Sequence, residues 1–255
     1  MPDAAAVIRL RIDLAYDGAG FRGFARQPDQ RTVQGVLEEA LAVLFGRPVA
    51  STGAGRTDAG VHASGQVISC DVPADSRYSD DLVRLRAALE HLCSDDISIW
   101  RVRRVPASFD ARFSATQRRY RYRLCDAVAM DPAWRFRTWH VGPPRLDVAA
   151  MEVGGGHLVG EHVFASFCRK RDGDALVRRI DRVAVRRGVG GLVVVGVDGA
   201  AFCHQMVRSI VGCLVEVGAA KRPQEWVGDV LAAQSRAAAP TVAPPHGLTL
   251  TAVRY

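Results

Sequence analysis

The apolar positions of the first hundred residues alternate between the spacing of a strand and the spacing of a helix. Residues 8–14 carry an apolar side chain at every second position, which predicts a half-buried strand. Thr32 precedes apolar residues at helical spacing and predicts the cap of a helix. Ser79 predicts the cap of a second helix, and 61–72 and 97–105 predict further strands. This order of elements is typical of an α+β fold.

The rest of the chain repeats a similar rhythm after Pro106. We place a boundary there, between an α/β domain of residues 1–105 and a second of residues 106–255. Residues 117–125 place tyrosines on one face of a predicted strand and arginines on the other. Further predicted elements are a helix near Asp147, strands at 176–188 and 191–198, a long helix at 200–218, a helix begun by Pro223 and a final strand.

The charge of the chain points to a polyanionic partner. The formal net charge is +7 and the pI is about 9.4, which favours nucleic acid or an anionic membrane. No apolar run approaches the roughly 20 residues of a spanning helix, and the N-terminus does not resemble a signal peptide. We therefore expect a cytoplasmic protein that binds nucleic acid and not a membrane.

The cysteines and histidines do not predict a metal or redox centre. The six cysteines include no Cys-x-x-Cys pair, and without a secretory signal we expect reduced, mostly buried thiols. The spacing of His157, His162 and Cys168, with Cys203 and His204, fits no common zinc pattern, so we expect no metal. The chain also lacks a P-loop and a dinucleotide-binding glycine motif, so we expect no cofactor.

The strongest candidate for catalysis lies between Gly53 and Val67, where glycines surround Arg56 and Asp58. Three glycines within eight residues indicate a loop whose shape matters. A guanidinium nearby favours the ionised carboxylate, and catalysis by an aspartate nucleophile or base needs that form. The residues alone leave two interpretations open, which are an active-site loop and a hairpin turn with a surface ion pair.

The segment 55–63, GRTDAGVHA, resembles the signature of the tRNA pseudouridine synthase A family. Four other segments resemble that family in the same order, at 15–27, 108–122, 201–208 and 247–250. The resemblance implies two ferredoxin-like α/β domains with fused, mainly antiparallel sheets around a central RNA-binding cleft. It implies an isomerase that converts uridine to pseudouridine on the 3′ side of the tRNA anticodon stem-loop (positions 38, 39 and 40). The family precedent is a homodimer in which one tRNA touches both subunits.

The resemblance also assigns roles to residues. Asp58 is the catalytic nucleophile, and Arg56 takes up the space of a uridine that is flipped out of the stem. Tyr120 stacks on the target uracil, although its alternation with Tyr122 also fits two core aromatic residues on one strand face. Leu248 of the closing strand belongs to the substrate-binding set. The candidates for phosphate contacts are Arg22, Arg26, Arg31, Arg118, Arg119, Arg121 and Arg123.

Arg208 is a candidate without the family. Between residues 200 and 217 the predicted helix is almost wholly apolar, and Arg208 and Glu216 are its only formally charged residues. A helix that is apolar all round is buried, and a buried guanidinium must be paired. Asp58 is a candidate partner, which would make Arg208 catalytic; the alternative is pairing with another carboxylate.

Two other functions are alternatives, although no residue of the sequence specifically favours either. A non-catalytic RNA-binding or tRNA-folding protein would keep the cleft without the chemistry. A metal-assisted hydrolase would need further carboxylates near Asp58, and none follows before Asp71. The chain departs from the family at Phe24 and Ala25, where the family commonly has Trp and Gln.

Overall fold

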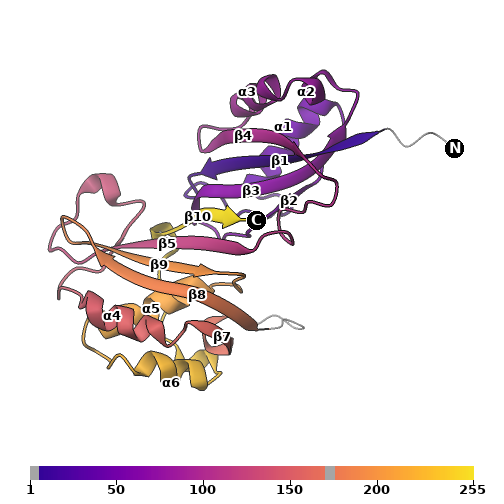
Figure 1. The fold of residues 1–255 in the computed structure, drawn as a ribbon. Coiled ribbons are helices and arrows are strands. Elements are labelled where there is room, and N and C mark those ends of the chain that lie inside the picture. Colours follow the sequence, from indigo (N-terminus) through magenta and orange to yellow (C-terminus); the bar gives the residue numbers. More distant parts are fainter. Residues whose placement is uncertain (1–5, 170–175) are drawn as a thin grey trace. The chain divides into compact units, whose positions relative to one another are not determined.

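The structure, a computed structural model, describes residues 6–169 and 176–255. The chain forms two compact units, whose elements are labelled in Figure 1. Unit 1 runs to Thr116 and includes Leu250–Tyr255, and unit 2 is Gln117–Thr249. Both units combine helices with mainly antiparallel strands, which confirms the predicted α+β class.

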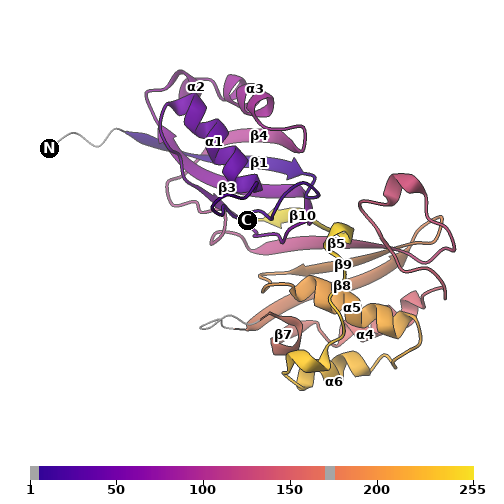
Figure 2. The ribbon, with the colours of Figure 1, turned by 180° about the vertical axis from the view of Figure 1, so that it is seen from behind.

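Unit 1 is a sheet with helices packed on one face. Its elements are β1 (Val7–Tyr16), α1 (Val33–Phe45), β2 (Ser51–Gly53), β3 (His62–Pro73), α2 (Arg77–Asp80), α3 (Leu82–Leu92) and β4 (Ile97–Val105). β1 pairs antiparallel with β3 and β4, and β2 pairs with β3. Leu10, Ile12 and Leu14 are fully buried, as the alternation predicted, and α1 lies across the sheet in Figure 2.

Of the two helix caps predicted for unit 1, Thr32 and Ser79, the structure confirms the first and not the second. The Thr32 hydroxyl accepts a hydrogen bond from the amide of Gly35, which confirms the predicted cap of α1. The prediction for Ser79 is wrong, because Asp81 caps α3 through the amide of Arg84. Ser79 lies inside the short α2, where its hydroxyl donates to the carbonyl of Pro73.

The division between the units, after Thr116, falls eleven residues beyond the boundary predicted between residues 105 and 106. Phe109 and Ala111 pack against Ala54 and Val67 of unit 1, and the Ala111 amide donates to the hydroxyl of Ser69 at 3.0 Å. The final strand, β10 (Leu248–Arg254), begins in unit 2 and continues in unit 1. Buried apolar contacts therefore hold the segment after Pro106 on unit 1.

Unit 2 holds strands in the order β5-β9-β8-β7, each antiparallel to its neighbour, and its helix α4 packs on β8. Its elements are β5 (Gln117–Cys125), β6 (Trp139–His140), α4 (Val148–Gly156), β7 (Gly160–Val163), β8 (Val177–Arg187), β9 (Leu192–Gly199), α5 (Met206–Gly218) and α6 (Trp226–Ala232). α4 lies so close to β8 that a Cβ at Gly155 would stand 2.5 Å from the Val183 side chain. The glycines of α4 therefore permit close helix–sheet packing.

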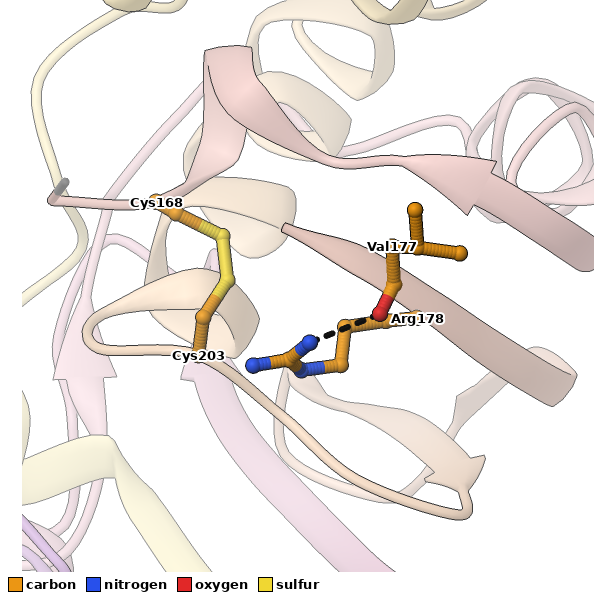
Figure 3. The surroundings of a disulfide bond; sticks show 4 residues. All are labelled: Cys168, Val177, Arg178 and Cys203. Carbon is orange, nitrogen blue, oxygen red and sulfur yellow. Dashed lines mark hydrogen bonds between the residues drawn. A yellow bond between two sulfur atoms is a disulfide. The ribbon is translucent and has the colours of Figure 1, made fainter. Parts of the chain in front are cut away.

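Two sequence predictions for unit 2 differ from the structure. The long helix predicted at 200–218 begins only at Met206, because Gln205 has a left-handed backbone with φ of 64°. Two of the six cysteines, Cys168 and Cys203, are joined in a disulfide, so the expectation of reduced thiols is wrong for this pair (Figure 3). The other four cysteines are free and buried, as expected.

Candidate active site

Asp58 lies in the loop that connects β2 to β3 in unit 1. Its side chain is half-buried, whereas the neighbouring Arg56 and Ala59 are exposed. The loop closes through a hydrogen bond from the Val61 amide to the Asp58 carbonyl at 3.2 Å. Gly60 has φ of 79°, a conformation that glycine adopts readily, so this glycine is required by the turn. The carboxylate thus sits on a tight turn of defined shape.

Gln66 of β3 holds the start of this loop. Its side-chain amide is fully buried and binds both backbone groups of Gly55. The Gly55 amide donates to Gln66 Oε1 at 3.2 Å, and Gln66 Nε2 donates to the Gly55 carbonyl at 2.8 Å. A fixed amide that satisfies both groups limits the loop to one backbone path.

Tyr16 of β1 holds the residue next to Asp58. Its hydroxyl lies 2.7 Å from Thr57 Oγ1 and 3.4 Å from Gln66 Nε2. Burial raises the pKa of Tyr16 to about 12, against a smaller opposing effect of its hydrogen bonds with Thr57 and Gln66. The phenol is therefore neutral at physiological pH and forms a fixed link between the sheet and the loop.

Phe24 and Gly23 pack the segment after β1 beneath the same loop. The Phe24 amide donates to the Thr57 carbonyl at 3.1 Å, and the ring is 1% exposed. A Cβ at Gly53 would stand 2.2 Å from that ring, so glycine at 53 makes room for it. Phe24 therefore supports the loop from within the core.

The arginines of unit 1 divide into paired and unpaired side chains. Arg26 lies 3.2 Å from the Glu38 carboxylate, and Arg31 lies 2.8 Å from that of Asp96. Arg22 and Arg56 make no side-chain ion pair or hydrogen bond with the described part of the chain. Arg56 is exposed, and the expected pairing of Arg56 with Asp58 is not seen among the residues that the structure describes.

In unit 2, Tyr120 lies on the buried face of β5. It is 8% exposed and makes an edge contact with Phe202, with 5.1 Å between ring centroids. Tyr122 and Leu124 are buried on the same face, as the alternation predicted. The ring of Tyr120 is thus held by strand geometry and by an aromatic neighbour.

Arg208 is anchored on α5 by a backbone carbonyl. Its Nε donates to the Ala243 carbonyl at 2.7 Å, and the Ala243 amide donates to the Arg208 carbonyl at 3.2 Å. Burial raises the pKa of Tyr122, and the charge of Arg208 opposes that shift. Arg208 is half-buried, not fully buried as predicted, since α5 exposes this position. The pairing of Arg208 with Asp58 stays a prediction.

Leu248 follows a single 3₁₀ turn, Pro245–Gly247, and is 5% exposed. The Tyr122 hydroxyl donates to the Pro244 carbonyl at 2.7 Å, and Gly247 lies against the Tyr122 ring. Unit 2 therefore brings Arg208 and the segment before Leu248 together around Tyr122.

The arginines of β5 are less available than the sequence suggested. Arg118 is buried and donates to the Ala200 carbonyl at 2.6 Å, which does not favour a phosphate contact. Arg119 and Arg121 lie 3.6 and 2.6 Å from the buried carboxylate of Asp198. Arg123 is exposed and has no side-chain partner among the residues described.

Sequence reasoning did not identify Tyr16, Thr57 and Gln66 as residues that shape the site. A signal was present, since Gln66 directly precedes the apolar pair Val67 and Ile68 in β3 and lies in a run of five buried residues, 66–70. Buried amides need partners, and the nearest unmatched backbone groups were those of the glycine loop. No group of three or more His, Cys, Asp or Glu side chains is arranged to hold a metal within residues 6–169 and 176–255. Within the same residues, no helix is long and apolar enough to cross a membrane.

Comparisons with known proteins cover nearly the whole chain. The model of a family described as tRNA pseudouridine synthase matches residues 14–114 and 156–255. The chain is 48% identical to tRNA pseudouridine synthase A of Frankia casuarinae over 98% of this chain and 90% of that protein. It is 42% identical to the protein of that name from Streptomyces avermitilis, over 97% and 88% of the two chains. The corresponding protein of Mycobacterium leprae is 40% identical, over 100% and 92%.

Proposed function

The chain belongs to the tRNA pseudouridine synthase family, and we propose that Asp58 is the nucleophile of its reaction. The enzyme isomerises uridine in tRNA to pseudouridine. The bond between N1 of the base and the sugar breaks, the base turns, and a bond forms from C5 to the same sugar carbon, while C5 loses its proton and N1 gains one. Nothing is oxidised or added, so the reaction requires no redox or group-carrying cofactor. It does require a carboxylate at the glycosidic bond and a pocket that holds the cleaved base.

One observation carries the assignment of Asp58. The family signature at 55–63 places this carboxylate on a turn that Gln66 and Tyr16 hold by their buried side chains. A catalytic group held within a fraction of an ångström gains its rate advantage from orientation. A surface hairpin would not need two buried polar side chains to fix its backbone.

We propose that the base is held by residues of unit 2. The uridine leaves its helical stack, at the expense of a few kcal/mol of stacking energy, and enters a pocket where Tyr120 stacks on it. Arg208 and Leu248 border that pocket, and Arg56 takes up the space that the base leaves. The rigid mounting of Tyr120 against Phe202 and of Arg208 against Ala243 supports these roles.

The phosphate contacts are proposed for the arginines that lack protein partners in the described chain. Arg22, Arg56 and Arg123 have exposed side chains of this kind. Arg26 and Arg119 already face carboxylates, and a phosphate there would compete with an existing pair. We therefore propose that Arg22 and Arg123 contact phosphates as expected, that Arg56 does so beside the space left by the base, and that Arg26, Arg118 and Arg119 contribute less.

For the position of the target uridine, the oligomeric state and the domain type, we rely on the resemblance to the family. We propose that the target is the 3′ side of the anticodon stem-loop, that the enzyme is a cytoplasmic homodimer, and that its units are ferredoxin-like domains around a central cleft. No observation specifically favours a non-catalytic RNA-binding protein.

The direct test is incubation with an unmodified tRNA transcript in excess chelator, without added metal or cofactor. Pseudouridine is then mapped by carbodiimide adducts that stop primer extension. We expect product on the 3′ side of the anticodon stem-loop with the parent protein, and none with Asp58→Ala. A parent protein that binds the transcript tightly but yields no pseudouridine would favour the RNA-binding alternative.

A further inference from the structure

Cys168 and Cys203 lie together in unit 2, although 35 residues separate them along the chain. Cys168 directly follows a 3₁₀ turn, Ala165–Phe167, and Cys203 lies three residues before α5. Their Cα atoms are 5.8 Å apart, within the range of disulfides, and Figure 3 shows the sulfur–sulfur bond. The Arg169 amide donates to the His204 carbonyl at 3.1 Å, so the backbone beside each cysteine is tied to the other independently of the sulfurs.

The other four cysteines provide an internal contrast. Cys70, Cys93, Cys125 and Cys213 are free and buried. Burial raises the pKa of Cys70 and Cys213 to about 12 and that of Cys93 to about 11. A thiol reacts as its thiolate, so the raised pKa protects Cys70, Cys93 and Cys213 from oxidation. Only one pair in the described chain combines proximity with a route to solvent.

That route is a cavity of about 480 Å³ whose lining includes Cys168, Arg169, Gln205 and Arg236. Arg169 is exposed, and the nearest carbonyl acceptors of Arg236 are 3.4 and 3.5 Å away, at the weak end of hydrogen bonding. Arg178 also belongs to the surroundings of the pair, where it donates to the Val177 carbonyl at 2.7 Å (Figure 3). Cationic side chains near a thiol favour its thiolate, and the same charges attract an anionic reagent.

We propose that Cys168 and Cys203 form a reversible modification site, which is oxidised by an anionic low-molecular-weight disulfide of the glutathione type bound beside Arg169 and Arg236. A cytoplasmic enzyme rarely carries a permanent disulfide, and those that do occur are usually transient or redox-sensing. The site is separate from the residues assigned to the isomerase reaction. Its consequence is a covalent tie between the segment after Ala165–Phe167 and the residues that lead into α5.

The reaction proceeds by two thiol–disulfide exchanges. The Cys168 thiolate, which lines the cavity, attacks one sulfur of the reagent, forms a mixed disulfide and releases the first small thiolate. The Cys203 thiolate then attacks the sulfur of Cys168 and releases the second. Two protein thiols become one disulfide, one reagent disulfide becomes two thiols, and the two protons and two electrons of the protein thiols pass to the reagent.

The test uses the full, reduced chain after removal of reductant. The protein is exposed to oxidised glutathione or, at equal concentration, to the neutral hydroxyethyl disulfide; remaining thiols are alkylated and peptides are analysed by mass spectrometry. We expect the six thiols to fall to four, with one linked peptide pair containing Cys168 and Cys203, and full return on reduction. Cys203→Ser should retain a glutathione adduct at Cys168, and Cys213→Ser serves as the matched control that leaves the linkage intact.

The charge of the cavity is tested separately. The double variant Arg169→Gln and Arg236→Gln should slow both reactions through a smaller thiolate fraction, but should slow the reaction with oxidised glutathione about tenfold more than the reaction with the neutral reagent, because only the anionic reagent loses an attraction. Equal slowing with both reagents would overturn the anionic part of the proposal. Six intact thiols after treatment of natively folded parent protein, or thiol loss spread over Cys70, Cys93 and Cys213, would overturn the site itself.

Discussion

Replacement of Gln66 by leucine isolates the contribution of a buried amide to the Asp58 loop. Leucine has a volume similar to that of glutamine and fills the same space. The change therefore removes hydrogen bonds without opening a cavity. The lost bonds are the two with Gly55, at 3.2 and 2.8 Å, the one from the Val67 amide to Gln66 Oε1 at 3.1 Å, and the longer one with the Tyr16 hydroxyl at 3.4 Å. Asp58 itself is left in place.

The expected loss of stability follows from those bonds. Each hydrogen bond contributes about 1 kcal/mol net, and each buried group left unsatisfied costs about 1–3 kcal/mol. Gly55 is only half-buried, so water replaces part of what is lost there. We therefore expect a fall in the free energy of unfolding of about 3 kcal/mol.

The expected loss of activity is larger than a general loss of stability would produce. A displacement of about 1 Å at a catalytic group lowers the rate by about 100-fold. Because Gln66 does not contact the substrate in the proposed mechanism, tRNA affinity should change little. Single-turnover rates at saturating tRNA, measured well below the unfolding transition, separate this effect from binding.

Gln34→Leu is the matched control. Gln34 Nε2 donates to the Ser51 carbonyl at 2.7 Å and to Glu38 Oε1 at 3.0 Å, so this variant loses comparable bonds away from the Asp58 turn. Both variants should show lowered midpoints in urea, but only Gln66→Leu should lose the catalytic rate. If the two variants have single-turnover rates within about threefold of each other, well below the 100-fold expected of a misplaced group, Gln66 does not position Asp58.

Asp58→Ala should lower the isomerisation rate by about 10⁴-fold or more while circular dichroism and tRNA affinity stay near those of the parent; activity within tenfold would refute the nucleophile. Arg22→Gln and Arg56→Gln should each reduce the slope of log affinity against log salt by about 0.7. Arg26→Gln should reduce that slope less, because Arg26 already faces Glu38. Equal slopes in all three variants would show that the RNA binds elsewhere. Because Tyr16 keeps its proton to a pKa of about 12 when folded and loses it near its ordinary pKa of 10 when unfolded, its contribution to stability is complete below pH 10 and is lost as pH rises to 12. Urea unfolding between these values should therefore be less pH-dependent in Tyr16→Phe by about 1.4 kcal/mol per pH unit, and an unchanged dependence would contradict the assigned burial.

Elements with local signals were predicted well from the sequence. The alternation of residues 8–14 and 117–125 gave the correct buried faces, since a strand exposes opposite sides at successive positions. The cap at Thr32 was correct because its partner, Gly35, is three residues away. In each case the deciding interaction lies within one element or depends only on its period.

Predictions failed where the local pattern permits more than one start for a helix, and where segments that are distant along the chain meet. Ser79 has the composition of a cap, but its hydroxyl binds Pro73 while Asp81 takes the capping position. The apolar run before Met206 reads as helix, yet a left-handed residue at 205 delays the start of α5. Cys168 and Cys203 meet only because the chain between them forms β8 and β9 and returns.

Net charge illustrates the same limit for function. The composition gives an excess of seven positive charges but does not say where the excess lies. Arg9 is paired with Asp71, Arg31 with Asp96, and Arg121 with Asp198. These paired cations contribute less to the attraction of RNA. Paired charges of opposite sign largely cancel beyond a Debye length of about 8 Å at physiological salt, whereas an unpaired guanidinium keeps its field. The attraction of tRNA should therefore depend on a few unpaired arginines, such as Arg22 and Arg56, more than on the arginine-rich strand β5 that the sequence makes most conspicuous.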